Sequence, residues 1–319
     1  MNLQEIAKRL GGDVSAAGIL CPGPNHSPKD RSLSVRFSGP SDFVVTSFAG
    51  DDFRLCRDHV KTRLGISDHD FKNPDSLQRK AWLATQAAQL EAEKAEKVSA
   101  QRAKAAPVWA GVKPLLGTIA QTYLTTARAI PLGLVRKAAE VGNLGFHPAL
   151  PSLFGSKTAP TYPAMIARAV DAEGIFVGIH ATFLQADGLG KVQSIGANGK
   201  KMLGAGFMGA CVRLGTGSRI VLAEGVETAL SAGALLNVCP VAALSAGGVA
   251  AWKPWQGVDS VLLGVDVDAS GAGQKAAEAC AVSIYQLGVE VEGFAIPSDG
   301  HRDFNDALRA CAGNIREVA

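Results

Sequence analysis

The chain has 319 residues, and its 47% apolar and 19% charged residues are typical of a globular protein with a buried core. No stretch approaches the roughly 20 uninterrupted apolar residues of a membrane span. The net charge of +3 is too small to establish nucleic-acid binding by itself. Because the start MNLQEIAKRLGG also lacks the apolar run of a signal peptide, we expect a cytoplasmic protein. Six scattered cysteines without a CxxC pair make a disulfide framework improbable, so we expect reduced thiols.

Residues 1–66 predict a small α+β module. Helical spacing ends at the first Gly-Gly pair, SLSVRF and FVVTSF alternate at strand period, and DDFRLCRDHVKTRLG returns to helical spacing. Residues 67–106 are rich in Ala, Gln, Glu and Lys, which predicts a helical linker ahead of Pro107.

Residues 107–218 predict a basic subdomain of mixed α/β structure. A helix around TIAQTYLTTARAI precedes turn-separated strands, among them GIFVGIHATFLQ. Five basic residues and no acidic one lie between Asp187 and Glu224, among glycines that let a backbone approach phosphates closely. We expect this strip to bind nucleotide and template, with contacts from Lys191, Lys200, Lys201 and Arg213.

Residues 219–319 alternate short apolar strands with helices, which predicts an α/β domain with a mainly parallel sheet. Glu224 ends one predicted strand, and Asp266 and Asp268 end another. Ligands of such sheets gather at the carboxyl ends of the strands, where clustered carboxylates repel each other unless cations neutralise them. The pattern therefore predicts Mg²⁺ or Mn²⁺ and phosphoryl or nucleotidyl transfer.

Two further acids each allow two interpretations. Glu227 lies in the first turn of the helix after Glu224, where it either supports the metal site or complements the helix dipole. Asp303 opens the last helix in DFNDAL, where Asp is an ordinary N-cap as well as a candidate metal ligand.

EGVETAL, VDVDASGAG and DFND resemble the acidic motifs of the Toprim domain, which bacterial primases, topoisomerases and some nucleases share. The resemblance implies a Rossmann-like fold with Glu224 as the general acid/base residue. It also implies that Asp266 and Asp268 are metal ligands, and that Glu227 and Asp303 are supporting acids around a second metal.

GIFVGIHATFLQADGLGKVQSIGANGKKMLG resembles the basic segment that leads into the catalytic domain of bacterial DnaG-type primases, and SDGHRDFND resembles their closing motif. This resemblance implies synthesis of short primers from nucleoside triphosphates on single-stranded DNA, in a phage or plasmid setting. No GxxxxGK[ST] motif is present, so we expect a separate replicative helicase.

Residues 1–66 resemble the zinc-ribbon module of these primases, which helps to select template sequence. LCPGPNH supplies Cys21 and His26, but Ser47 and Asp51 stand where the module has two more cysteines. Tetrahedral zinc needs four good nitrogen or sulfur ligands. We therefore expect a degenerate module without structural zinc, in which Cys21 and His26 are weak candidate ligands.

Two alternative functions compete with the primase. A standalone Toprim nuclease would use the same carboxylates, whereas a non-catalytic DNA-binding replication accessory protein would need none of them. Because nothing structural requires Glu224, Asp266 and Asp268 to cluster, the sequence favours an enzyme, a nucleotidyltransferase.

Overall fold

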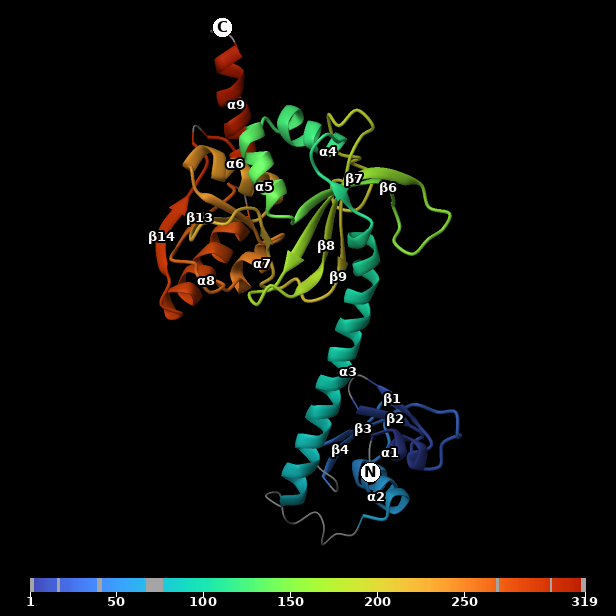
Figure 1. Cartoon of the computed structure of the whole chain (residues 1–319). Coiled ribbons are helices and arrows are strands. Elements are labelled where there is room, and N and C mark those ends of the chain that lie inside the picture. The colour runs from blue at the N-terminus through green and yellow to red at the C-terminus, as the bar shows by residue number, and fades with distance from the viewer. Residues whose placement is uncertain are drawn as a thin grey trace. The chain divides into compact units, whose positions relative to one another are not determined.

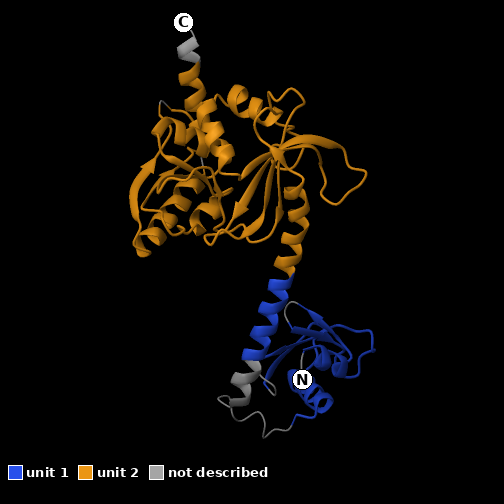
Figure 2. Cartoon of the chain, viewed as in Figure 1, with its two compact units in different colours: residues 1–96 blue, residues 97–319 orange. Residues whose placement is uncertain are grey.

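The computed structural model describes residues 3–15, 18–38, 42–66, 77–267, 270–298 and 300–316, and for 77–83 and 313–316 it describes the backbone only. Asp268, a predicted metal ligand, lies outside the described residues. The chain forms two compact units, Met1–Glu96 and Lys97–Ala319 (Figure 2). Their boundary falls inside one helix, whereas the division into 1–66, 67–106, 107–218 and 219–319 stays a prediction.

Unit 1 is built on a four-stranded antiparallel sheet in which the strands lie in chain order (Figure 1). Strand β4 alternates buried and more exposed side chains, as the period-2 sequence pattern predicts, whereas the first three residues of β3 are all buried. The elements are α1 (Leu3–Leu10), β1 (Asp13–Ser15), β2 (Gly18–Cys21), β3 (Leu33–Phe37), β4 (Phe43–Ser47) and α2 (Phe53–Leu64).

The ends of α2 show why this helix forms where it does. The Asp52 side chain accepts hydrogen bonds from the backbone N–H groups of Arg54 and Leu55, which caps the start of the helix. Gly65 ends it in the left-handed conformation, with φ of 69°. The helix buries Cys56 and its apolar neighbours against the sheet, so unit 1 has a core of its own.

The helix α3 (Leu77–Ala110) covers the described residues of the predicted linker and continues past Pro107. The helix therefore ends four residues beyond residue 106, the predicted end of the linker. Proline lacks the N–H group that a helix interior needs, but helical geometry continues for three further residues, and Gly111 N donates to Pro107 O at 3.2 Å.

The first sheet of unit 2 is antiparallel, in the order β5-β6-β7-β8-β9. Its central strands are long and apolar, and β8 is buried along almost all of its length. The strands and the helices that precede or connect them are β5 (Lys113–Pro114), α4 (Ile119–Thr122), the π-helix η2 (Tyr123–Ala127), α5 (Leu132–Glu140), β6 (Leu144–Pro151), β7 (Thr161–Val170), β8 (Phe176–Phe183) and β9 (Lys200–Gly204).

The second sheet of unit 2 has the order β10-β12-β11-β13-β14, and its last four strands are parallel. The prediction of an α/β domain with a mainly parallel sheet is confirmed, and β10 adds an antiparallel edge. The elements are β10 (Val212–Arg213), β11 (Arg219–Ala223), α6 (Val226–Leu236), β12 (Cys239–Ala242), α7 (Ala246–Ala251), β13 (Ser260–Gly264), α8 (Ala272–Gln286), β14 (Glu290–Ala295) and α9 (Phe304–Arg316).

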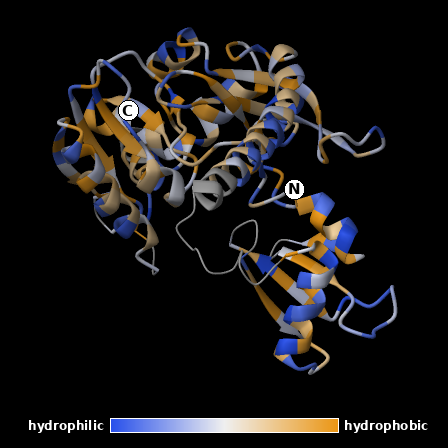
Figure 3. Ribbon diagram, turned by 90° about the horizontal axis from the view of Figure 1, so that it is seen from below, coloured by the Kyte–Doolittle hydropathy of each residue, from blue (hydrophilic) through white to orange (hydrophobic). Residues whose placement is uncertain are grey.

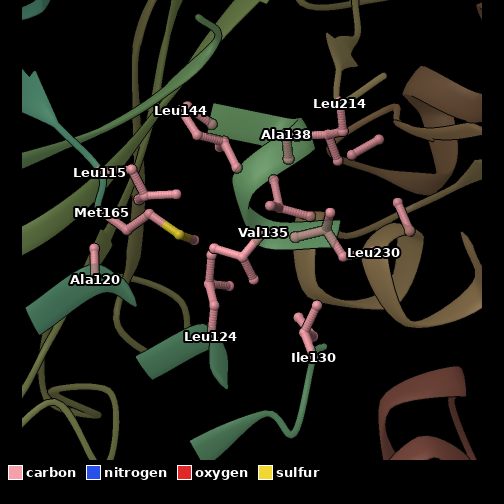
Figure 4. Packing of buried hydrophobic residues seen from close by; sticks show 14 of the residues in the cluster. Leu115, Ala120, Leu124, Ile130, Val135, Ala138, Leu144, Met165, Leu214 and Leu230 are labelled. Carbon is pink, nitrogen blue, oxygen red and sulfur yellow. The ribbon is translucent and has the colours of Figure 1, made fainter. Parts of the chain in front are cut away.

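One hydrophobic cluster joins the two sheets of unit 2 (Figure 4). Leu124 and Val135, from the helices of the antiparallel part, pack in the same cluster as Leu214 and as Leu230 of α6. Burial of such side chains is worth about 1.5–3 kcal/mol each, so the two parts hold each other in place.

Hydrophobic residues concentrate on the strands of both units, whereas the helices carry mixed faces (Figure 3). Among the described residues, no helix combines the length and the apolar character that crossing a membrane requires.

Candidate active site

Two predicted carboxylates follow neighbouring strands of the parallel sheet. Strand β11 lies between β12 and β13, and Glu224 directly follows it. Asp266 comes two residues after the end of β13. Because β11 and β13 are parallel, with Leu222 paired to Leu263, both acids lie at the carboxyl edge of the sheet.

Asp303 reaches this edge from the loop before α9. Its Oδ1 accepts a hydrogen bond from the backbone N–H of Asp306 at 2.8 Å, so the N-cap interpretation is confirmed. Asp303 also lines the cavity in which Glu224 and Asp266 lie. Its predicted role in metal binding stays a prediction.

That cavity, of about 390 Å³, brings five of the predicted site residues together. The carboxylates come from the parallel sheet and its loops, whereas the two lysines come from β9 of the antiparallel sheet. The cavity is therefore lined by both parts of unit 2. Its lining residues are Glu224, Asp266, Asp303, Lys200, Lys201, His180, Ala197, Met202, Gly225, Thr228 and Leu244.

The donor atoms of the cavity suit a hard cation. Carboxylate oxygens are the ligands that Mg²⁺ and Mn²⁺ prefer, and three carboxylates line this one space. Among the described residues, no three His, Cys, Asp or Glu side chains come close enough to hold one ion. A complete set of metal ligands would therefore include Asp268, or would require the side chains of the cavity carboxylates to turn toward one another.

Glu227 is buried beside the cavity and is not part of its lining. Its Oε1 accepts a hydrogen bond from the Tyr123 hydroxyl at 2.8 Å, and its Oε2 accepts from Lys200 Nζ at 3.1 Å. Burial alone would raise the pKa of Glu227, but the charges of Lys200 and Lys191 outweigh burial and hold that pKa well below its usual range. Glu227 is thus an ionised, fully engaged carboxylate.

A chain of hydrogen bonds extends from Glu227 through three elements. Arg128 Nε donates to the Tyr123 hydroxyl at 2.9 Å, and Arg128 Nη1 donates to Asn305 Oδ1 at 3.2 Å. Asn305 Nδ2 donates to Ser231 Oγ at 2.9 Å, and Ser231 Oγ donates to Glu227 O at 2.8 Å. This network ties η2 to α6 and α9 next to the cavity.

A family model for the Toprim domain matches residues 219–313, the segment that contains the parallel strands β11 to β14 and all three cavity carboxylates. Residues 219–313 form a Toprim domain. Residues 99–214 match a second model, described as a domain of unknown function (DUF7146). No curated protein matches the chain.

Solved structures of primases are similar to this chain at low identity. The primase fragment of the bacteriophage T7 primase-helicase protein is 20% identical, with a TM-score of 0.37 over 60% of this chain and 70% of that one. The Aquifex aeolicus primase, with its zinc-binding and RNA polymerase domains, is 15% identical, with a TM-score of 0.42 over 99% and 83%. The RNA polymerase domain of Mycobacterium tuberculosis primase DnaG is 17% identical, with a TM-score of 0.41 over 69% and 82%.

Arg213 is predicted to contact nucleotide, but it does not line the cavity. Its guanidinium lies 4.2 Å from the ring centroid of Trp255, a residue of the Toprim domain. Its Nη2 donates to the backbone oxygens of Asp171 and Ala172 at 3.2 and 2.9 Å. These contacts tie β10 to the β7–β8 turn, and the predicted nucleotide contact of Arg213 stays a prediction.

The predicted lysines differ in their surroundings. Lys200 lies in the cavity and pairs with Glu227, whereas Lys201 lines the cavity while its Nζ donates to Ser152 O at 2.5 Å. Lys191 does not line the cavity. Burial lowers the pKa of Lys191, an effect that the nearby Glu227 partly offsets.

His180 is a cavity residue that the sequence analysis did not single out. It lies on β8, is 6% exposed, and burial lowers its pKa to about 4, so the imidazole is neutral at neutral pH. The available signal was a His and a Thr at alternating positions of an otherwise apolar strand, GIHATF. That pattern did not indicate that this strand would lie beside the Toprim carboxylates, so it could not place His180 at the cavity.

A hydrogen-bonded cluster occupies the zinc-ribbon positions of unit 1. His26 Nδ1 lies 2.9 Å from Asp30 Oδ2, and His26 Nε2 lies 3.1 Å from Asp51 Oδ1. Ser47 Oγ donates to the other oxygen of Asp51 at 2.8 Å. Cys21 is buried, and burial raises the pKa of its thiol to about 11. Both ring nitrogens of His26 thus contact carboxylates, and the Cys21 thiol is protonated at neutral pH.

Proposed function

We propose that this chain is a DNA primase, a metal-dependent nucleotidyltransferase that makes short primers from nucleoside triphosphates on single-stranded DNA. The observation that carries the proposal is the cavity in which Toprim carboxylates face lysines of the neighbouring sheet. A nucleoside triphosphate needs both a metal site and positive charge for its phosphates. The proposal rests on this cavity, the Toprim family and the sequence motifs, and not on the distant structural similarities.

In this proposal, Asp266 and Asp303 would hold Mg²⁺ or Mn²⁺ together with Asp268. When bound, the ion would neutralise charge on the phosphates as the phosphoryl bond is made and broken. Glu224 is exposed at the same edge of the sheet, directly after the central strand β11. Its carboxylate would take the proton from the attacking 3′-hydroxyl group.

The lysines would bind the phosphates. Lys200 and Lys201 line the cavity, and the buried carboxylate of Glu227 fixes the amine of Lys200 at 3.1 Å. Because both oxygens of Glu227 already accept hydrogen bonds, the geometry favours a positioning role for this residue over the metal role predicted from the sequence. Arg213 and Lys191 would act on the fold around the cavity rather than on the substrate.

A synthesis assay tests the proposal. The purified chain is incubated with single-stranded DNA, labelled nucleotides and Mg²⁺ or Mn²⁺, alongside Asp266→Ala and Glu224→Gln. We expect short products from the wild type and none from either variant, with DNA binding retained. Glu292→Gln, which replaces a Glu outside the cavity, is the matched control and should synthesise normally.

Other outcomes would favour other functions. Template degradation that Asp266→Ala abolishes would establish the standalone nuclease instead. DNA binding without synthesis or degradation would favour the accessory protein. A separate helicase, a phage or plasmid setting and a cytoplasmic location are proposed from the sequence alone.

A further inference from the structure

Two buried polar side chains lie on one face of β8 next to the cavity. His180 and Thr182 are two residues apart and therefore point to the same side of the sheet, where they lie opposite Met202 and Lys200 of β9. His180 is 6% exposed and Thr182 is fully buried. Within the described part of the chain, His180 Nδ1 and Thr182 Oγ1 have no hydrogen-bond partner.

Thr182 does not line the cavity, so only the unpartnered imidazole of His180 calls for an explanation by a bound molecule. His180 lines the cavity although its Nδ1 is enclosed. The ring therefore meets the cavity through its other edge, which carries Nε2. Because the imidazole is neutral, His180 offers a hydrogen bond but no charge for a phosphate.

The surroundings of His180 also differ from those of the metal and phosphate groups. Its cross-strand neighbour Met202 is 45% exposed and lines the cavity, as does Leu244. Lys200 lies one step further along the same face, opposite Thr182. The cavity thus offers charged groups beside a neutral, partly apolar surface, which matches the two halves of a nucleotide.

We propose that His180 is a nucleoside-binding residue, whose Nε2 hydrogen-bonds to the base edge or to a sugar hydroxyl of a nucleoside triphosphate bound in this cavity. The inference rests on the proposed function, since it assumes that the cavity takes a nucleotide. It adds a contact that recognises the nucleoside separately from its phosphates.

Calorimetric titration of the full-length chain with nucleotides, in a buffer that contains Mg²⁺, tests this contact without requiring synthesis. The probes are the four ribonucleoside triphosphates, their 2′-deoxy and 3′-deoxy forms, and inorganic tripolyphosphate. We expect His180→Ala to weaken ribonucleotide binding about tenfold and to leave tripolyphosphate binding unchanged. His180→Gln, whose amide reaches the position of Nε2, should restore binding, whereas His180→Asn should not.

Two further variants serve as controls. Lys201→Ala should weaken both classes of probe, because it removes a charge that acts on phosphates. Thr182→Val, a neighbouring buried substitution, should leave both affinities unchanged. If His180→Ala weakens the binding of nucleotides with one base only, the contact is with a base edge. If it weakens the binding of all four ribonucleotides but not of one deoxy form, the contact is with the hydroxyl group that this form lacks.

The two levels of the proposal fail differently. If the wild type binds no nucleoside triphosphate, the proposed function itself is wrong. If it binds them and His180→Ala has the same affinities, or weakens tripolyphosphate equally, only the role of His180 is overturned. If His180→Ala does not fold, the comparison uses His180→Gln and His180→Asn, and equal nucleotide affinities of these two variants would overturn the role of His180.

Discussion

Replacing Glu227 by Gln is expected to destabilise unit 2, because Glu227 is the buried anion that pairs with Lys200. Gln keeps the volume of the side chain and still accepts a hydrogen bond from Tyr123, so no cavity is created. Its amide, however, would face Lys200 Nζ where the carboxylate oxygen now lies, 3.1 Å away. The variant therefore removes the charge of Glu227 and its hydrogen bond with Lys200 while it keeps the volume of the side chain.

The magnitude follows from the burial of the two partners. The side chain of Glu227 is 7% exposed and that of Lys200 is 26% exposed. Removing one partner of a buried pair costs about 3–5 kcal/mol, and the partial exposure of Lys200 favours the lower end, about 3 kcal/mol. In the exposed pair of Arg219 and Glu292 the side chains are 56% and 20% exposed, so Glu292→Gln is expected to cost no more than about 1 kcal/mol.

Urea unfolding of the full-length chain, followed by tryptophan fluorescence, measures both variants. The comparison separates burial from distance, because the surface pair is the closer one, at 2.7 Å. If distance decided the energy, Glu292→Gln would be the more destabilising change. Equal or larger destabilisation by Glu292→Gln would therefore refute the reasoning.

Three further results are expected. Arg213→Ala should lower the free energy of unfolding by about 2 kcal/mol, through lost backbone hydrogen bonds and stacking, without changing the KM for nucleotides; a raised KM would restore the predicted nucleotide contact. The hydrogen bond with Asp30 raises the pKa of His26, so its stabilising effect is complete below the ordinary 6.5 and is lost as pH rises through the folded value. Hydrogen bonds with Ser32 and His26 lower the pKa of Asp30, whose effect is complete above the ordinary 3.8 and is lost in stronger acid. Calorimetry of the full-length chain should therefore show the unit 1 transition highest between about pH 4 and 6.5, and a flat profile would contradict the role of this cluster. Zinc should leave that transition unchanged in the wild type but raise it after combined Ser47→Cys and Asp51→Cys; stabilisation of the wild type would show that zinc binds without those cysteines.

The parts of the fold that could be predicted are those that local patterns determine. Apolar runs of strand length alternating with helical spacing after Arg219 predict a parallel sheet, and the sheet has parallel strands there. Once the strands are parallel, Glu224 and Asp266 must share an edge. The continuation of α3 past Pro107 could not be predicted, because a rule for an isolated proline does not include the packing around it.

The parts of the site that could not be predicted depend on contacts between distant residues. Tyr123 is 104 positions from Glu227, and no local pattern indicates that its hydroxyl satisfies a buried carboxylate. Arg213 looks like a phosphate ligand in a basic strip, but its stacking on Trp255 exists only in the folded chain. His180 belongs to an ordinary-looking strand until the cavity beside it is known.

The shared core of unit 2 means that two family matches do not make two folding units. The matches end at residue 214 and begin again at residue 219, yet Leu214 and Leu230 lie in one cluster with the helices of the antiparallel part. A fragment cut between the matches would expose that apolar surface and leave the Glu227 carboxylate without Tyr123 and Lys200. Residues 99–214 and the Toprim domain are therefore expected to unfold together in one cooperative transition, and a destabilising mutation in either part is expected to destabilise both.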